Sequence, residues 1–185
     1  MMELNYDVRG EGPMIRKATL DDLSAVSAIY EAIHDGEEAG RLTIGWARGV
    51  YPTADTARAA IEAGELYVLE HEGRAAASAR INREQMPAYA QVQWRWPAPD
   101  DRVLVMHTLT VDPALSRRGF ARQFLEFYET LARDMGCAVL RIDTNARNAV
   151  ARAMYARHGY VESGVIPCVF NGIPGVQLVC MEKRV

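Results

Sequence analysis

The chain has 185 residues, of which 49% are hydrophobic and 24% are charged, and its formal net charge is −3. These values are typical of one globular domain with a proper core, and they argue against a general nucleic-acid-binding protein, whose surface is usually basic. The sequence contains no run of 18 apolar residues that could span a membrane, and its three cysteines lack metal-site spacing, which is typical of a reducing cytoplasm.

The first half of the chain is expected to be largely antiparallel. Residues 1–13 contain no apolar core of signal-peptide length, and we interpret them as a flexible leader or added strand before a single domain over residues 14–185. Thr19 is expected to cap a helix, because Asp21 and Asp22 would lie in its first turn. In chain order we expect a strand over 14–19, a helix from 20 to about 34 that buries Leu20, a glycine-rich loop over 35–53, a helix over 54–64, a hairpin over 65–82 and a strand segment over 88–96.

The second half of the chain alternates strands with helices. Glycines mark the ends of both expected helices, and the first helix carries one continuous apolar stripe. The expected elements are a strand over 101–112, a helix over 117–135, a buried strand over 137–143, a helix over 148–159, and closing strands over 160–166 and 176–183. This order predicts an α+β fold, a three-layer arrangement with a mixed, twisted sheet and helices on both faces.

Three arginines gather where the long apolar strand leads into the next helix. Arg117, Arg118 and Arg122 fall in the expected first turn without an acidic neighbour, although a helix N-terminus already carries about half a positive charge. An anion bound among them would relieve the repulsion, and Gly119 and Ala121 are small enough to let it approach the backbone. We interpret this stretch as a pyrophosphate cradle; the alternative is a solvated helix start with exposed arginines. It is neither a P-loop nor a dinucleotide fingerprint.

One face of the helix over 148–159 is small and polar. Asn148, Ala151, Arg152 and Tyr155 share this face, because they lie at helical spacing. By itself, the asparagine is typical of a local cap, and the tyrosine of a half-buried packing residue.

Together the two stretches resemble the GNAT superfamily of acyl-CoA-dependent N-acetyltransferases. The superfamily's pyrophosphate motif, [QR]-x-x-G-x-[GA] after L-x-V-x-P, is matched by "LTVDPALSRRGFA", except that Ser116 replaces its first residue. Its second motif, N-x-x-A-x-x-x-Y-x-x-x-G-[FY], is matched by "NAVARAMYARHGY". The resemblance covers about residues 14 to 183, and it implies a mostly antiparallel sheet that is splayed at its central strands.

The resemblance implies that acetyl-CoA is the cosubstrate. The backbone amides of residues 117–122 would then hold the pyrophosphate, the central strand would pair with pantetheine and polarise the thioester carbonyl, and Asn148 would bond the pantetheine or a nearby water. Tyr155 would lie beside the sulfur. The implied cofactor-binding residues are Leu109, Thr110, Val111, Arg117, Arg118, Gly119, Phe120, Ala121, Arg122, Asn148 and Tyr155.

The general base is left open, with His107 and Tyr155 as the catalytic candidates. His107 lies on the central strand, and its ordinary pKa suits a proton relay. Regular alternation would place Val105, His107 and Leu109 on one face of that strand. The alternative is a buried histidine that bonds to a loop.

In the GNAT fold the connection after the first helix lines the acceptor pocket. Carboxylates there, at Asp35, Glu37 and Glu38, would attract a cationic amine, or they would simply be solvated. The candidate acceptor-binding residues are Glu38, Trp46, Tyr51, Asn82, Tyr89 and Trp94, each of which could equally be a packing residue.

We therefore expect an N-acetyltransferase that moves an acetyl group from acetyl-CoA to a small-molecule amine. Direct attack in a ternary complex is favoured, because no Cys–His pair indicates a covalent intermediate. The alternatives are a non-catalytic acyl-CoA-binding module and an enzyme that acetylates protein N-termini or lysines. We expect no metal, nucleic acid or membrane partner. The resemblance allows a homodimer, although no exposed apolar patch in the sequence indicates one.

Overall fold

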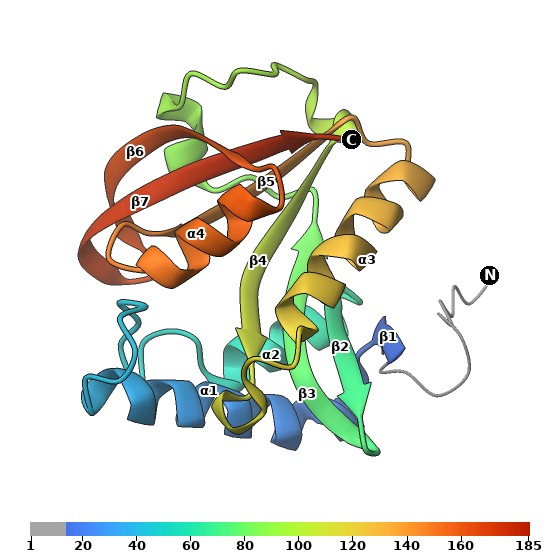
Figure 1. Ribbon diagram of the computed structural model, residues 1–185, viewed down its shortest axis with the longest axis vertical. Coiled ribbons are helices and arrows are strands. Elements are labelled where there is room, and N and C mark those ends of the chain that lie inside the picture. Colours follow the sequence, from blue (N-terminus) through green and yellow to red (C-terminus); the bar gives the residue numbers. More distant parts are fainter. Residues whose placement is uncertain (1–13) are drawn as a thin grey trace.

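The computed structural model describes residues 14–185, so the leader expected over residues 1–13 lies outside the described residues. Seven strands form one sheet in the order β1-β2-β3-β4-β5-β7-β6, and every neighbouring pair is antiparallel except β4 and β5 (Figure 1). This arrangement confirms the predicted mixed, mostly antiparallel α+β fold. The strands are β1 (Met14–Lys17), β2 (Leu66–His71), β3 (Arg74–Asn82), β4 (Val103–Val111), β5 (Val139–Asn145), β6 (Val161–Phe170) and β7 (Ile173–Arg184).

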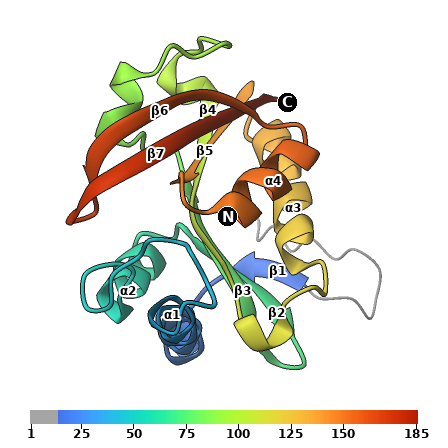
Figure 2. The ribbon, with the colours of Figure 1, turned by 60° about the vertical axis from the view of Figure 1, so that its left-hand side comes forward.

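Helices cover both faces of the sheet (Figure 2). One face carries α1 (Leu23–Glu38) and α2 (Ala54–Glu62), and the other carries α3 (Phe120–Asp134) and α4 (Ala149–Arg157). The main core lies under α3, where Phe124 and Tyr128 are fully buried. The Tyr128 hydroxyl lies 2.6 Å from the Leu104 carbonyl oxygen and 3.0 Å from that of Arg141, so it ties α3 to both central strands.

The two central strands are paired over only part of their length. β4 and β5 run in parallel from Val103 and Val139 to Met106 and Ile142, and their pairing ends there. Beyond that point β4 stays with β3 while β5 stays with β7, and the ribbons diverge (Figure 1). The sheet is therefore open between its two halves, as the family resemblance implied.

A β-bulge lies on β4 where the opening begins. Thr108 has a φ of +53°, which is unusual for a β-branched residue, and the register with β3 shifts at this point. The bulge breaks the regular alternation that the sequence predicted. Met106 and Leu109 both pack toward the core under α3, so His107 and Leu109 do not share a face of the strand.

Some boundaries differ from the sequence-based predictions. Residues 88–96 form no strand. Pro87–Gln91 is a short 3-10 helix, and the backbone N–H groups of Arg95 and Trp96 donate to the Glu182 carboxylate rather than to a neighbouring strand. The arginine-rich helix begins at Phe120 rather than at residue 117. The first helix continues to Glu38, and Leu20 is 53% exposed rather than buried.

The final hairpin is longer than predicted. β6 and β7 are joined by Asn171 and Gly172, which both have positive φ, as a tight hairpin turn requires.

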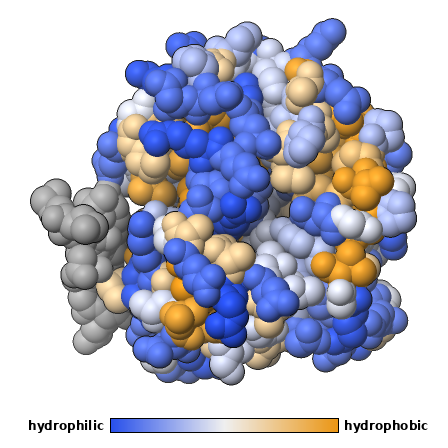
Figure 3. Space-filling model, turned by 180° about the vertical axis from the view of Figure 1, so that it is seen from behind, coloured by the Kyte–Doolittle hydropathy of each residue, from blue (hydrophilic) through white to orange (hydrophobic). Residues whose placement is uncertain are grey.

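The face shown in Figure 3 is largely hydrophilic, with separate hydrophobic areas. Among residues 14–185, no helix has the length and apolar character needed to cross a membrane. The homodimer stays a prediction.

The loop after α1 is fastened against the end of β5. The Glu37 carboxylate accepts hydrogen bonds from the backbone N–H groups of Ile44 (2.6 Å) and Gly45 (3.0 Å). Gly45 has a φ of +83° and lies so close to Asn145 that an added Cβ would be 2.3 Å from its Nδ2 atom. A side chain at position 45 would therefore have to displace the Asn145 side chain, whose Oδ1 atom accepts a hydrogen bond from the Arg147 N–H at 3.0 Å.

We expect Gly45→Ala to destabilise the protein by more than the cost of a left-handed backbone alone, which is about 1–2 kcal/mol. Gly40→Ala is the matched control, because Gly40 has a φ of +69° but no atom within 4 Å of the added Cβ. The free energy of unfolding of both variants is measured by urea titration. Equal losses would show that the loop does not pack on β5 as described.

Candidate active site

A cavity of about 130 Å³ lies where β4 and β5 separate. Its walls come from both halves of the sheet, from α3 and α4 on one side and from the loop after α1 on the other, so it passes through the opening rather than lying on one face. The lining residues are Ile44, Gly45, Trp46 and Tyr51 from the loop; Met106, Thr108, Leu109 and Val111 from β4; Ala121, Asn148, Ala151, Met154 and Tyr155 from α3 and α4; and Asp143, Thr144, Asn145, Phe170, Val176 and Leu178 from β5, β6 and β7.

The turn that precedes α3 offers a row of free backbone donors. The N–H groups of residues 117–122 donate to no other group within the described part of the chain. Arg117 and Gly119 both have positive φ, at +65° and +82°, and alternating backbone hands of this kind form a concave anion-binding nest. An added Cβ at Gly119 would meet no protein atom within 4 Å, so the space over this backbone is open.

The three arginines at this turn are less crowded than the sequence predicted. Only Arg122 belongs to the helix, and its charge is offset by Glu126, whose carboxylate accepts from its Nε at 2.7 Å. Arg118 lies 3.2 Å from the His71 ring, and Arg117 bonds to no side chain among residues 14–185. The nest thus keeps two exposed guanidinium groups at its rim.

Tyr155 projects from α4 into the cavity and is 6% exposed. Within residues 14–185 its hydroxyl has no hydrogen-bond partner, while its ring packs edge-on against Tyr160. Burial raises the pKa of Tyr155, and the nearby Asp143 carboxylate raises it further. The hydroxyl therefore stays protonated at neutral pH and can donate to a ligand.

Asn148 also lines the cavity, but part of its side chain is already used. It is the N-cap of α4, and its Oδ1 atom accepts from the Ala151 N–H at 3.1 Å. The amide nitrogen is the group that remains for a ligand.

A carboxylate that the sequence pattern did not indicate lies in the same cavity. Asp143 is the first residue of β5 beyond the segment that pairs with β4. Its Oδ2 atom accepts from the Tyr89 hydroxyl at 2.8 Å. Burial raises the pKa of Asp143 to about 6, against the opposing effect of that hydrogen bond. The available signal was an acidic residue at the end of the otherwise apolar run "CAVLRI".

The structure places His107 in a different, neighbouring cavity of about 310 Å³. Its Nε2 atom bonds to Asn82 at 3.1 Å, and burial, helped by the Arg80 charge, lowers the pKa of His107 to about 4. Tyr51 and Thr108, whose hydroxyl groups bond to each other, line both cavities and separate the histidine from Tyr155.

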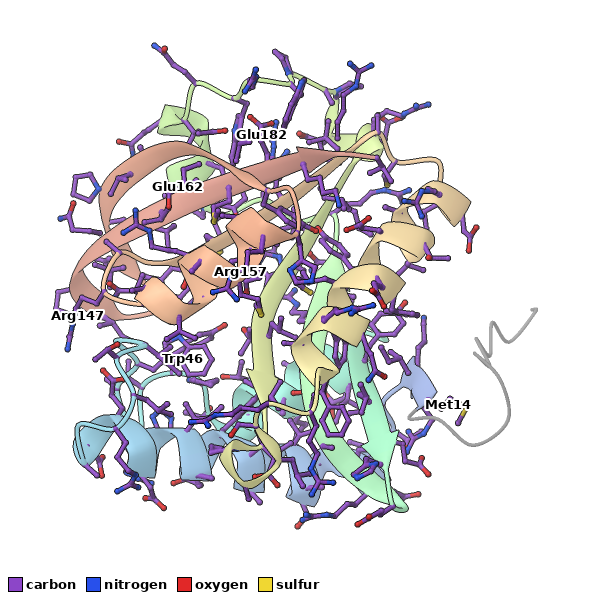
Figure 4. All side chains as sticks on the ribbon, viewed as in Figure 1. Met14, Trp46, Arg147, Arg157, Glu162 and Glu182 are labelled. Carbon is purple, nitrogen blue, oxygen red and sulfur yellow. The ribbon has the colours of Figure 1, made fainter. Side chains whose placement is uncertain are left out.

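The predicted acceptor residues are divided among several places. Trp46 lines the first cavity together with Tyr51 and Phe170, and the three rings meet edge-on with centroids 6.0 and 5.7 Å apart. Figure 4 shows Trp46 between the α1–α2 half and the end of the molecule that carries α4. The aromatic rings thus form the end of the cavity that faces away from the nest.

The other predicted acceptor residues do not line this cavity. Glu38 is exposed and bonds to Arg48 at 2.8 Å, and Asn82 bonds to Glu65 and His107. The Tyr89 hydroxyl donates to Asp143, and Trp94 lines a separate cavity. Residues 14–185 contain no cluster of three or more histidine, cysteine or acidic side chains that could hold a metal ion.

Comparison with known proteins adds independent information. The model of the acetyltransferase (GNAT) family matches residues 26–160 of the chain. Comparison with curated proteins found no similar sequence. Among solved structures, a GNAT-family acetyltransferase from Streptococcus agalactiae superposes with a TM-score of 0.77 at 21% identity, over 97% of this chain and 99% of that one.

Two further solved structures share the fold. The Salmonella typhimurium protein yncA, solved with its cofactor acetyl-CoA, has a TM-score of 0.66 at 20% identity, with 94% of both chains covered. The ribosomal-protein-alanine N-acetyltransferase from Brucella melitensis has a TM-score of 0.67 at 21% identity, over 92% of this chain and 99% of that one. The family model and these folds agree with the nest and the opened sheet: the chain belongs to the GNAT family of acetyltransferases, and it is an acyltransferase.

Proposed function

We propose that the protein transfers the acetyl group of acetyl-CoA to the amine of a small molecule by direct attack. One observation carries this proposal. A single cavity through the opened sheet contains a free tyrosine hydroxyl and a carboxylate whose pKa is raised, and it begins beside a nest of free backbone N–H groups.

The nest is suited to the diphosphate of coenzyme A. Backbone donors of residues 117–122 would bond to its oxygens, and Arg117 and Arg118 would add charge at the rim. The pantetheine arm would pair with β4 from Leu109 to Val111, because this edge is no longer bonded to β5. A backbone N–H of the same stretch would polarise the thioester carbonyl. This assignment keeps the cofactor-binding set that the sequence predicted.

Asp143 is the proposed proton acceptor, in place of His107. An alkylamine titrates near ~10.4 and arrives as an ammonium ion, which the partly buried carboxylate of Asp143 attracts. The ammonium ion first releases one proton to water, and the neutral nitrogen then attacks the thioester carbon. As the C–N bond forms, the acidity of the N–H rises steeply, and Asp143 takes this second proton and passes it to the departing thiolate. The C–S bond breaks as the C–N bond is completed. Each turnover consumes one ammonium ion and one thioester, and it yields an amide, a thiol and one released proton.

Tyr155 is the proposed partner of the sulfur. Its raised pKa keeps the hydroxyl protonated, so it can donate to the thiolate that develops as the C–S bond breaks. A free thiol titrates near ~8.5, so hydrogen bonding rather than complete proton donation from Tyr155 is the favourable interaction. None of the three cysteines lines the cavity, which supports direct transfer rather than an acetyl-enzyme.

A small acceptor is favoured by the way the cavity is closed. The loop after α1 is fastened over the opening by Glu37, and the aromatic rings of Trp46, Tyr51 and Phe170 leave a narrow space. An assay of acetyl transfer to a panel of small amines, to free lysine in a peptide and to a peptide with N-terminal alanine tests this point. Turnover of the peptides alone would reject a small acceptor, and binding of acetyl-CoA without any turnover would identify a non-catalytic module.

We expect Gly119→Val to abolish acetyl-CoA binding, because its side chain would project into the open space over the nest. Gly136→Val is the matched control: Gly136 also has a positive φ (+68°) and open surroundings, but it lies at the far end of α3. Calorimetric titration with acetyl-CoA compares the two variants. Affinity retained in Gly119→Val, or lost equally in Gly136→Val, would contradict the cradle.

We expect Tyr155→Phe to lower kcat by about 10²-fold or more while changing the Kd for acetyl-CoA little, because the hydroxyl acts on charge that exists only in the transition state. Steady-state kinetics and calorimetry on the same preparation give both numbers. Parallel loss of binding and turnover would make Tyr155 a packing residue. Tyr160→Phe is the control, because its hydroxyl is buried without a partner away from the cavity lining.

We expect the activity of the wild-type protein to rise with pH through a value of about 6, as Asp143 loses its proton and becomes a base. Asp143→Asn should lose about 10²-fold or more in kcat/KM and should lack this acid limb. Tyr89→Phe removes a hydrogen bond that favours the ionised carboxylate, so the limb should move to higher pH. An unchanged limb in Asp143→Asn would exclude Asp143 as its origin.

A further inference from the structure

A larger cavity, of about 560 Å³, lies between β5 and the segment that connects β3 to β4. Its walls are mainly apolar and include Met86, Val92, Trp94 and Pro97. Arg141 is the only cationic residue that lines it, and Asp100 is the only acidic one. This cavity shares no lining residue with the proposed active site.

The charge of Arg141 is buried and has no directly bonded counterion. The residue is 4% exposed, and no carboxylate in the described part of the chain lies within ion-pair distance of it. Its Nη1 donates to the Gln85 side-chain oxygen, while its Nε is buried without a partner. The guanidinium carbon lies 4.0 Å from the Trp94 ring centroid, and burial lowers the pKa of Arg141.

The acidic residue that faces Arg141 across the sheet is already engaged elsewhere. Glu182 on β7 lies opposite Arg141 in the strand register, below the segment that covers the cavity (Figure 4). Its two oxygens accept from the Arg95 N–H at 2.5 Å, the Trp96 N–H at 3.3 Å and the Ser163 hydroxyl at 2.6 Å. Glu182 therefore fastens the segment to the sheet and balances the guanidinium only from a distance.

A buried guanidinium without a bonded carboxylate is unfavourable, because the aromatic ring and one amide oxygen replace only part of its hydration. Here it lines an open, mostly apolar cavity. A ligand that brings one carboxylate would bond to the guanidinium in its planar, two-pronged geometry, and an apolar body would cover Trp94 and Met86.

We propose that this cavity binds a monocarboxylate with an apolar body as a separate ligand, at Arg141. A dianion such as phosphate fits less well, because the cavity offers one cation and its single carboxylate, Asp100, would repel a second negative charge. The site goes beyond acetyl transfer, since it shares no lining residue with the cavity proposed for that reaction. It has a physical link to the active site: the Tyr89 ring lines this cavity, and its hydroxyl bonds to Asp143.

The test is calorimetric titration of the ligand-free protein with benzoate at fixed ionic strength, with benzamide and inorganic phosphate as comparators. Benzamide has the shape of benzoate without its charge. We expect one benzoate per chain, at least tenfold weaker binding of benzamide and of phosphate, and a loss of about tenfold or more in Arg141→Met. Arg102→Met removes an exposed arginine from the same segment and should bind benzoate like the wild type.

A second measurement decides the matter if Arg141→Met does not fold. In spectra of the wild-type protein labelled at arginine, benzoate should shift the Nε–H resonance of Arg141, and benzamide should not; Arg141→Lys identifies the resonance. Absence of benzoate binding, equal binding of benzamide, or full binding to a folded Arg141→Met would overturn the proposal. Neither measurement requires acetyl transfer, so a negative result would overturn this ligand site without contradicting the proposed function.

Discussion

Hydrogen bonding between β4 and β5 ends after Met106 and Ile142, and the arrangement of the site depends on that early end. The backbone groups of each strand that face the gap need partners, and an extended ligand between them can supply these as a further strand would. The bulge at Thr108 bends β4 away at this point, and Tyr128 holds the paired ends together from below. The opening is therefore a built feature of the sheet.

Burial gives the two titratable groups of the opening complementary properties. It raises the pKa of Asp143 toward the working range of a general base, and it keeps the Tyr155 hydroxyl protonated as a donor. Asp143 strengthens this division, because its carboxylate raises the pKa of Tyr155 further. At the other end of the cavity the charge is reversed, since the nest before α3 presents only N–H groups and guanidinium groups.

Strand β5 links the proposed active site to the cavity at Arg141. Arg141 and Asp143 are two residues apart, so they project from the same face, while Leu140 and Ile142 pack into the core on the opposite face. Tyr89 contacts both regions through its ring and its hydroxyl. The connection between β3 and β4, which looks like a simple excursion from the sheet, thus supports the carboxylate at the active site and covers the second cavity.

The sequence by itself determined the features that depend on local pattern. The spacing around Gly119 and Tyr155 indicated the family, and periodicity with glycine stops located the helices and most strands, because these signals lie within a few residues of one another. Only the tertiary structure decided which side chains share the site. The bulge at Thr108 moved His107 out of it, the end of strand pairing brought Asp143 into it, and packing under the 83–102 segment buried Arg141. These outcomes depend on contacts between residues far apart in the chain, which no local pattern records.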